Sequence, residues 1–234
     1  MRTPSRTERG IQFTQAGAGL PGIISFRGSD EFRSEDMMAY EVGYRMQQNE
    51  RLSWDIATFY NVYDRLQTRE ISFPTLVGGF PVFPVTAANK MQGESYGVEI
   101  ALNWHLTDWW RIKPSYSFLE INVERDAGST DVTSHTLAGS SPQQTFSAWS
   151  YMDLPNGFEL DTGFRYVDSL PDLGVPGYVA LDVRVGWRMN DYVTVSVGAK
   201  NLLDDRHSEF PPTLFYLENA EVQHSAYVKV VVTF

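Results

Sequence analysis

The feature that most constrains this chain is the length of its alternating segments. Residues 222–234 place Val228, Val232 and Phe234 on one face and polar side chains such as Lys229 on the other. A strand of a soluble sheet is usually about five or six residues long, whereas a tilted strand that crosses a bilayer needs about 9–11. Length and alternation together therefore predict a transmembrane β-barrel strand.

Nine segments of the chain have this two-residue period and comparable length. We therefore predict an all-β fold, an antiparallel transmembrane β-barrel portion of about nine long strands with short periplasmic turns and long extracellular loops. In one segment Phe146 and Trp149 have opposite parity, so the sequence does not assign its two faces. The predicted strands are 37–47, 51–64, 92–105, 109–123, 143–153, 158–167, 179–189, 192–201 and 222–234.

One face of these strands repeatedly carries charges of both signs. In a barrel that spans a membrane, such a face lines the wet interior, because the lumen is polar. Glycines on the same face, among them Gly97, Gly163 and Gly198, leave room for a close approach. The predicted lumen-facing charges are Glu41, Arg45, Glu99, Arg111, Arg165, Asp182, Arg184 and Lys200.

The opposite face is rich in aromatic residues, which make up 14% of the whole chain. A closed soluble core of this size would have difficulty packing several Trp and Phe among its Val and Leu. Outside a barrel, the same side chains anchor the protein at the two membrane interfaces. A soluble β-barrel binding protein, with the apolar face inside, is an alternative. The predicted interface aromatics are Tyr44, Trp54, Trp104, Trp110 and Trp187.

The connections between the segments alternate in length, with short turns at 106–108 and 190–191 and long loops at 67–90 and 204–221. Because short turns lie on the periplasmic side, nine strands that end in the periplasm must start outside the cell. We therefore predict that residues 1–36 are an extracellular loop segment and barrel lead-in, and that 37–234 are the C-terminal part of a larger barrel. A small closed outer-membrane barrel of about ten strands, acting as a passive pore or adhesin, is a second alternative.

The composition excludes several classes of function. A net charge of −10 argues against nucleic acid as a partner, and the absence of cysteine excludes disulfides and thiolate metal sites. The four histidines are scattered without metal-ligand spacing. We expect no catalytic residues, no metal site and no cofactor, and hence a protein that is not an enzyme. The N-terminus lacks the apolar core of a secretory signal, so we expect an export signal upstream.

Five short motifs occur in the order in which they occur in the second half of TonB-dependent outer-membrane receptors, and the chain resembles that family. The motifs are Arg2-Thr-Pro-Ser-Arg6, the strand that ends Tyr40-Glu-Val-Gly-Tyr-Arg45, Gly93-Glu-Ser-Tyr-Gly-Val-Glu99, Val175-Pro-Gly-Tyr-Val-Ala-Leu-Asp182 and Lys200-Asn-Leu-Leu-Asp204, followed by a terminal Phe234. His207 departs from the family pattern, which often has Tyr at this place.

The resemblance implies a barrel of about 22 strands closed by an N-terminal plug, which imports a ferric siderophore or similar ligand. It also implies outer-membrane lipid and the barrel-assembly machinery as partners, the latter reading Phe234 as an assembly signal, and coupling to TonB only through a plug region that these 234 residues do not contain. The location would be the bacterial outer membrane. Proline-stiffened aromatic loops are the candidates for ligand contact by position: Phe73, Phe80, Phe83, Phe210, Phe215 and Tyr216.

Overall fold

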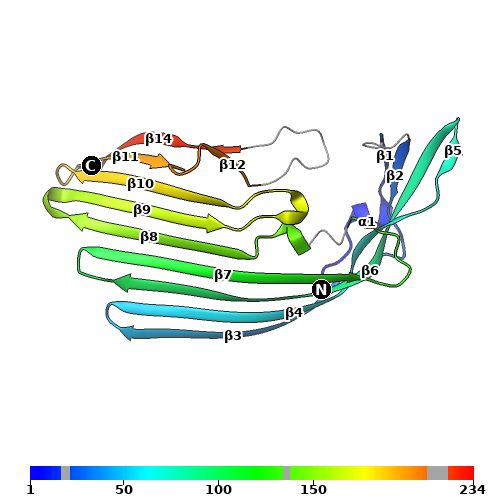
Figure 1. The fold of residues 1–234 in the computed structure, drawn as a ribbon, viewed down its shortest axis with the longest axis horizontal. Coiled ribbons are helices and arrows are strands. Elements are labelled where there is room, and N and C mark those ends of the chain that lie inside the picture. The colour runs from blue at the N-terminus through cyan, green and yellow to red at the C-terminus, as the bar shows by residue number, and fades with distance from the viewer. Residues whose placement is uncertain (17–21, 134–137, 210–220) are drawn as a thin grey trace. The chain divides into compact units, whose positions relative to one another are not determined.

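The computed structural model describes residues 1–16, 22–133, 138–209 and 221–234, and nearly all of its regular structure is β-strand (Figure 1). The chain divides into two compact units, which are described separately. Unit 1 comprises Met1–Tyr40, Tyr60–Tyr96 and Ile121–Ala138, and unit 2 comprises Glu41–Phe59, Gly97–Glu120 and Gly139–Phe234.

Long strands follow one another as antiparallel neighbours along the chain. Pairing runs from β6 through β7, β8, β9, β10 and β11 to β14, while β4 pairs with β3 and β6. All nine predicted alternating segments are strands, and the prediction of an all-β, mainly antiparallel fold is confirmed. The long strands are β3 (Asp36–Asn49), β4 (Leu52–Ile71), β6 (Phe80–His105), β7 (Trp110–Arg125), β8 (Gln144–Leu154), β9 (Phe158–Val167), β10 (Tyr178–Arg188), β11 (Val193–Lys200) and β14 (Ser225–Val232).

In unit 2 the register places small residues opposite aromatic ones. Gly163 pairs with Trp149 across β8 and β9, and a Cβ atom at Gly163 would meet the indole ring. Gly198 of β11 likewise pairs with Tyr227 of β14, and a Cβ atom at Gly198 would meet the tyrosine ring. The predicted close approach at these glycines is therefore confirmed. The register also assigns the ambiguous segment: Trp149 lies on the face of Gly163, and Phe146 packs against Phe164 on the other.

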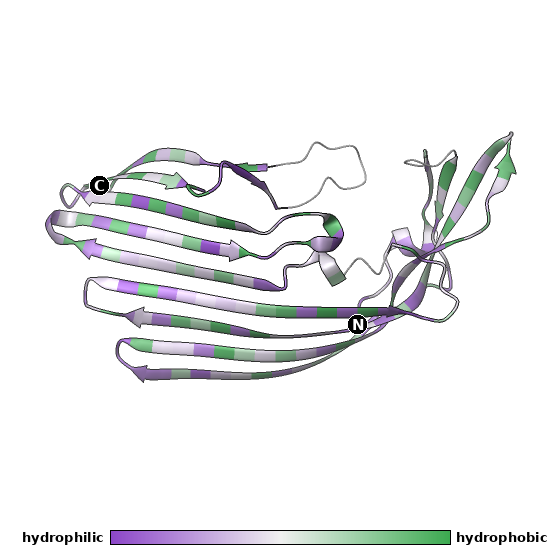
Figure 2. Cartoon of the chain, in the orientation of Figure 1, coloured by the Kyte–Doolittle hydropathy of each residue, from purple (hydrophilic) through white to green (hydrophobic). Residues whose placement is uncertain are grey.

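The two faces of unit 2 differ in exposure in the sense expected of a membrane strand. Apolar side chains are the more open ones: Val197 is 54% exposed and Val228 70%. On the polar face, the side chains of Glu159 and Asp161 are only 22% and 24% exposed. Alternating bands of hydrophobic and hydrophilic residues follow the strands in Figure 2. A soluble barrel would have the opposite distribution, with its apolar face covered.

Unit 1 contains a small sheet that the sequence did not predict. The N-terminal part of β6 pairs with β5 (Thr75–Val77) antiparallel and with β2 (Ile23–Arg27) parallel, and β2 pairs with β1 (Gln12–Ala16). A short helix, α1 (Arg6–Gly10), precedes β1. The β5–β6 hairpin turns through Gly78 and Gly79, both at positive φ, where glycine is the residue of lowest cost.

The predicted loop 67–90 is wrong for much of its length, since β4 continues to Ile71 and β6 begins at Phe80. The reason lies at Arg65, whose φ of 58° interrupts the extended backbone within β4. A residue of this conformation is typical of a β-bulge, and a bulge breaks the two-residue period from which the strand was recognised. The N-terminal part of β6, which alternation alone does not show, is stabilised by pairing with β2 and β5.

The predicted last strand is also interrupted. Residues 222–234 form a short strand β13 (Glu221–Gln223), which pairs with β12 (Arg206–Ser208), and then β14 after His224. The connection between β8 and β9 is a short turn, η2 (Pro155–Gly157), in which Asn156 has a left-handed conformation. A further single turn, η3 (Pro171–Leu173), connects β9 and β10. Among the described residues no helix has the length and apolar character needed to cross a membrane.

Candidate ligand-binding site

Of the aromatic residues predicted to contact a ligand, the three that the structure describes do not form one surface. Phe73 lies between β4 and β5 and is 94% exposed, and Phe80 at the start of β6 is 66% exposed. Phe83 is half-buried beside Ile24 of β2. It lies three positions from Phe80, so the two side chains leave β6 on opposite faces. The remaining candidates, Phe210, Phe215 and Tyr216, lie outside the described residues.

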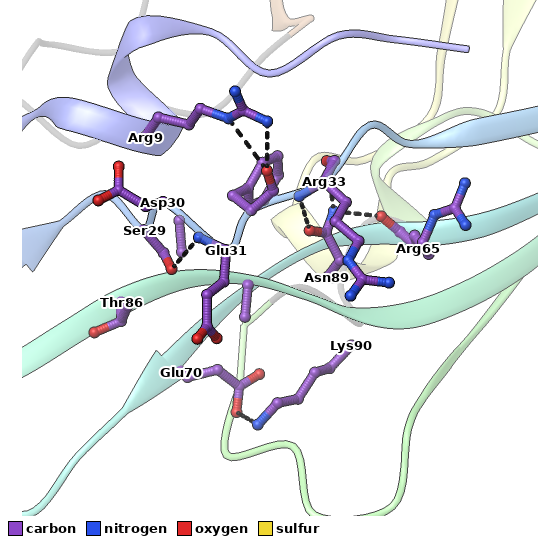
Figure 3. Close-up of a pocket in the computed structure, with 13 residues that line it drawn as sticks. Arg9, Ser29, Asp30, Glu31, Arg33, Arg65, Glu70, Thr86, Asn89 and Lys90 are labelled. Atoms are coloured by element: carbon purple, nitrogen blue, oxygen red, sulfur yellow. Dashed lines mark hydrogen bonds and ion pairs between the residues drawn. The ribbon is translucent and has the colours of Figure 1, made fainter.

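A hollow of about 880 Å³ in unit 1 is a better-formed site, and the sequence did not predict it. Figure 3 shows its walls: the loop Ser29–Arg33, Arg9 of α1, Arg65 and Glu70 of β4, and residues 86–90 of β6. The signal that could have found it is the mixed-sign run Asp30-Glu-Phe-Arg33 beside a glycine and a serine. A charged loop of this kind is usually a solvated surface, so the sequence alone does not distinguish it as a site.

The loop is fixed at one buried residue and one side-chain amide. Phe32 is 1% exposed, and its carbonyl oxygen accepts hydrogen bonds from Arg9 Nε at 3.3 Å and Nη2 at 3.2 Å. Asn89 Oδ1 accepts from the Arg33 backbone N–H at 2.7 Å, while Asn89 Nδ2 donates to the carbonyls of Arg33 and Arg65. The backbone of the loop from the carbonyl of Phe32 to that of Arg33 is therefore held in place by side chains of the protein.

The Arg-Thr-Pro-Ser motif at the N-terminus builds the support behind this loop. Arg2 Nη2 donates to Glu8 at 2.6 Å and Nε donates to Glu35 at 2.5 Å. Ser5 is the N-cap of α1 and its backbone N–H donates to Glu8 at 2.6 Å. Burial raises the pKa of Glu8, but the hydrogen bonds from Arg2 and Ser5 outweigh it and hold that pKa below its usual range. The carboxylate is therefore charged and part of an ionic network.

Glu70, beyond the bulge in β4, joins three segments of unit 1. It accepts hydrogen bonds from the Thr130 backbone N–H at 2.8 Å and from Ser129 Oγ at 2.8 Å, and Lys90 lies 3.4 Å away. Burial raises the pKa of Glu70, yet the hydrogen bonds, that of Thr130 first, lower it overall. Nearby, the backbone N–H of Arg69 donates to buried Asp131 at 2.6 Å. The loop that contains these residues is thereby tied to β4.

Several of the charges predicted to line the lumen are paired across strands in unit 2. Arg184 donates to Asp161 at 2.7 Å and to Glu159 at 3.0 Å. The other predicted members differ in their pairing. Arg165 lies 3.9 Å from Asp182, Arg45 donates to Asp55 at 2.6 Å, Arg111 stacks over the ring of Tyr151, and Glu41, Glu99 and Lys200 have no ion pair with any residue that the structure describes.

The predicted interface aromatics lie near the short turns, some of them in pairs. Tyr44 packs against Trp54 with ring centroids 5.2 Å apart, and Trp187 stacks on Phe158 at 5.6 Å. Trp104 is exposed at the end of β6, and the Nε1–H of Trp110 donates to Ser150. Phe234 at the end of the chain is fully exposed.

His207 is buried and central to a polar cluster at the end of β11. Its ring stacks on Tyr178 at 3.9 Å, with Asp204 3.3 Å from Nδ1 and Glu209 3.6 Å from Nε2. Within the described ranges no group of three or more His, Cys, Asp or Glu side chains fits a metal ion.

Long antiparallel strands, with an open apolar face and a charged face joined by ion pairs, define a sheet of the transmembrane-barrel class. The chain belongs to the family described as TonB dependent receptor-like, beta-barrel, whose model matches residues 1–202. The resemblance inferred from the five motifs is thereby confirmed. Proteins of this family are receptors of the outer membrane.

Curated relatives are similar over part of this chain. The probable TonB-dependent siderophore receptor PiuA of Acinetobacter baumannii is 27% identical over 152 residues, which is 59% of this chain and 20% of the relative. The ferrioxamine B receptor of Salmonella typhimurium is 28% identical over 127 residues, 49% of this chain and 18% of the relative. The chain thus spans about a fifth of the length of the curated relatives that it matches.

Solved structures share the fold at low sequence identity. A mutant of the ferric enterobactin receptor PfeA of Pseudomonas aeruginosa has a TM-score of 0.68 at 13% identity, covering 99% of this chain and 36% of that one. The ferripyoverdine receptor of the same organism, solved with ferripyoverdine bound, has a TM-score of 0.63 at 14% identity, covering 86% and 27%.

Proposed function

We propose that this chain forms the C-terminal part of the barrel of an outer-membrane TonB-dependent receptor that imports ferric siderophores. The observation that carries the proposal is the exposure pattern of unit 2, where apolar rows such as Val197 and Val228 are open and the ionised cluster of Arg184, Glu159 and Asp161 is sheltered. Lipid would solvate the first face and water the second. Membership of the receptor family and the siderophore receptors among its relatives supply the ligand class.

In this proposal residues 1–36 are an extracellular lead-in and 37–234 are barrel. Tyr44, Trp54, Trp104, Trp110 and Trp187 would lie at the membrane interface near the periplasmic turns, where amphipathic rings are favoured. The charged face would line the lumen, with Arg184 and its two carboxylates as its best-paired member. Binding to TonB would belong to a plug outside these 234 residues. The barrel-assembly machinery would recognise the strand that ends at Phe234.

The protein would act by binding and transport rather than by catalysis. A deletion of its gene, tested under iron limitation, should abolish uptake of radiolabelled iron from one ferric siderophore and leave uptake from unrelated chelates unchanged. Ferrioxamine B, ferric enterobactin and ferripyoverdine form a suitable panel, because similar receptors are named for them. Uptake should also stop when TonB is removed. Uptake that continues without TonB would instead favour the small passive barrel.

The soluble alternative is tested separately by fractionation. The protein should remain in the outer-membrane fraction and require detergent for extraction, since its exposed Val and Trp rows need an apolar solvent. A monodisperse soluble monomer without detergent would overturn the proposal.

A further inference from the structure

We propose that the hollow in unit 1 binds a zwitterionic, amino-acid or peptide-type group, with its carboxylate near Arg33 and its ammonium near Glu31. This inference deepens the proposed function and rests on it, because it takes the zwitterionic group to be part of the imported chelate. The class of ligand would then be a ferric siderophore built on an amino-acid scaffold with a free amine and a free acid.

The first support is a set of charged side chains without ionic partners. Asp30, Glu31, Arg33 and Arg9 all line the hollow, and none of them forms an ion pair with any residue in the described part of the chain. Other charges of the wall are already engaged, as Lys90 lies 3.4 Å from Glu70 and Arg65 pairs with Asp36. Since the guanidinium of Arg9 is held by the carbonyl of Phe32, two acids and the guanidinium of Arg33 are left to face a ligand.

The second support is the separation of these charges within the site. In Figure 3 the carboxylates of Asp30 and Glu31 lie to the left of the guanidinium group of Arg33. Oppositely charged groups that line one hollow without pairing create an electric field between the basic and the acidic side. A neutral ligand gains little from such a field, and a ligand of a single charge is attracted at one side and repelled at the other. A zwitterion oriented along the field satisfies both sides.

The third support is the rigidity of the backbone that carries the charges. Buried Phe32 sits between Glu31 and Arg33, and its carbonyl is held by two hydrogen bonds from Arg9. Asn89 holds the backbone N–H and carbonyl of Arg33. A site whose backbone is already ordered loses less entropy on binding. Its volume of about 880 Å³ lies in the range of small-molecule sites, about 300–1,000 Å³.

Guanidinium suits a carboxylate because its N–H groups match the two carboxylate oxygens, which makes Arg33 the specific contact for the acid. The exposed Glu31 and Asp30 remain hydrated in the free protein, so exchange of water for an ammonium group carries a small desolvation cost. Loss of one charge-assisted contact typically weakens binding by about tenfold.

The test is equilibrium dialysis of radiolabelled triglycine against the purified receptor that carries this chain, in detergent. Triglycine should bind saturably. N-acetyltriglycine, which lacks the ammonium, and triglycine amide, which lacks the carboxylate, should each bind about tenfold more weakly. Arg33→Gln should lower triglycine affinity about tenfold and remove the preference over the amide. Glu31→Gln should likewise lower triglycine affinity about tenfold and remove the preference for triglycine over N-acetyltriglycine.

Two exposed residues outside the hollow provide matched controls. Arg6→Gln and Glu50→Gln remove charges of the same kinds and should leave triglycine binding unchanged. No saturable binding, equal binding of the blocked peptides, or equal affinities of wild type, Arg33→Gln and Glu31→Gln would each overturn the inference. A receptor that binds triglycine selectively but imports no ferric chelate would refute the proposed function and leave the zwitterion site in place.

Discussion

The contact network of Arg2 makes a quantitative prediction about local stability. Its guanidinium joins Glu8, in α1, to Glu35, just before β3, and its backbone pairs with Glu35 through two hydrogen bonds of 2.8 and 3.1 Å. The side chain of Glu8 is 7% exposed, whereas that of Arg2 is 48% exposed. Arg2→Ala therefore removes one contact to a buried carboxylate and one contact nearer to solvent.

The first of these contacts is worth about 1.5 kcal/mol, the lower end for a hydrogen bond to a charged group. Solvent screening limits the second to about 0.5 kcal/mol. The local free energy of opening of residues 1–35 should fall by about 2 kcal/mol, which corresponds to about 30-fold faster amide exchange. Hydrogen exchange with mass spectrometry on the intact receptor measures this directly. The control is Arg6→Ala, an exposed position at the start of α1, with an expected change below about 0.5 kcal/mol.

The effect should depend on pH in a defined direction. The pKa of Glu8 is lowered in the folded state, so the stabilisation is fully present above the usual carboxyl pKa and is lost as pH falls through the folded value. After correction for intrinsic exchange, wild type and Arg2→Ala should converge in acid. Equal exchange of the two proteins at neutral pH, or a difference that grows on acidification, would show that Arg2 does not hold the N-terminal segment.

Three further predictions concern other parts of the chain. Gly163→Val places a branched side chain against Trp149 and should lower the yield of folded receptor by about half or more on heat-modifiability gels, unless Trp149→Ala restores it. Glu70→Gln keeps the shape but removes the charge that Thr130 and Ser129 stabilise, and should increase protease cleavage within 126–133; unchanged cleavage would contradict this. Phe234→Ala should reduce the amount of assembled receptor in outer-membrane fractions without affecting its synthesis, as measured by immunoblot.

Much of the sheet was predictable because alternation is a local property. A strand with lipid on one side and water on the other must change polarity at every residue, so β8 to β11 can be located from sequence with errors of a residue or two. The same parity places Gly163 and Gly198 on the charged face, but only the register of the sheet shows that they lie opposite Trp149 and Tyr227. The prediction of strands from alternation fails beyond Arg65, because the positive φ of this residue interrupts the two-residue period within β4.

The candidate site was not predictable for a related reason. Its walls come from α1, the loop at 29–33, β4 and β6, and nothing in the order of these residues shows that Asn89 holds the backbone of Arg33. By itself the sequence determined which residues alternate, and hence that strands of this chain have one apolar and one charged face. Only the tertiary structure decided which charges neutralise one another and which are left facing a hollow, because pairing depends on distances between segments far apart in the chain.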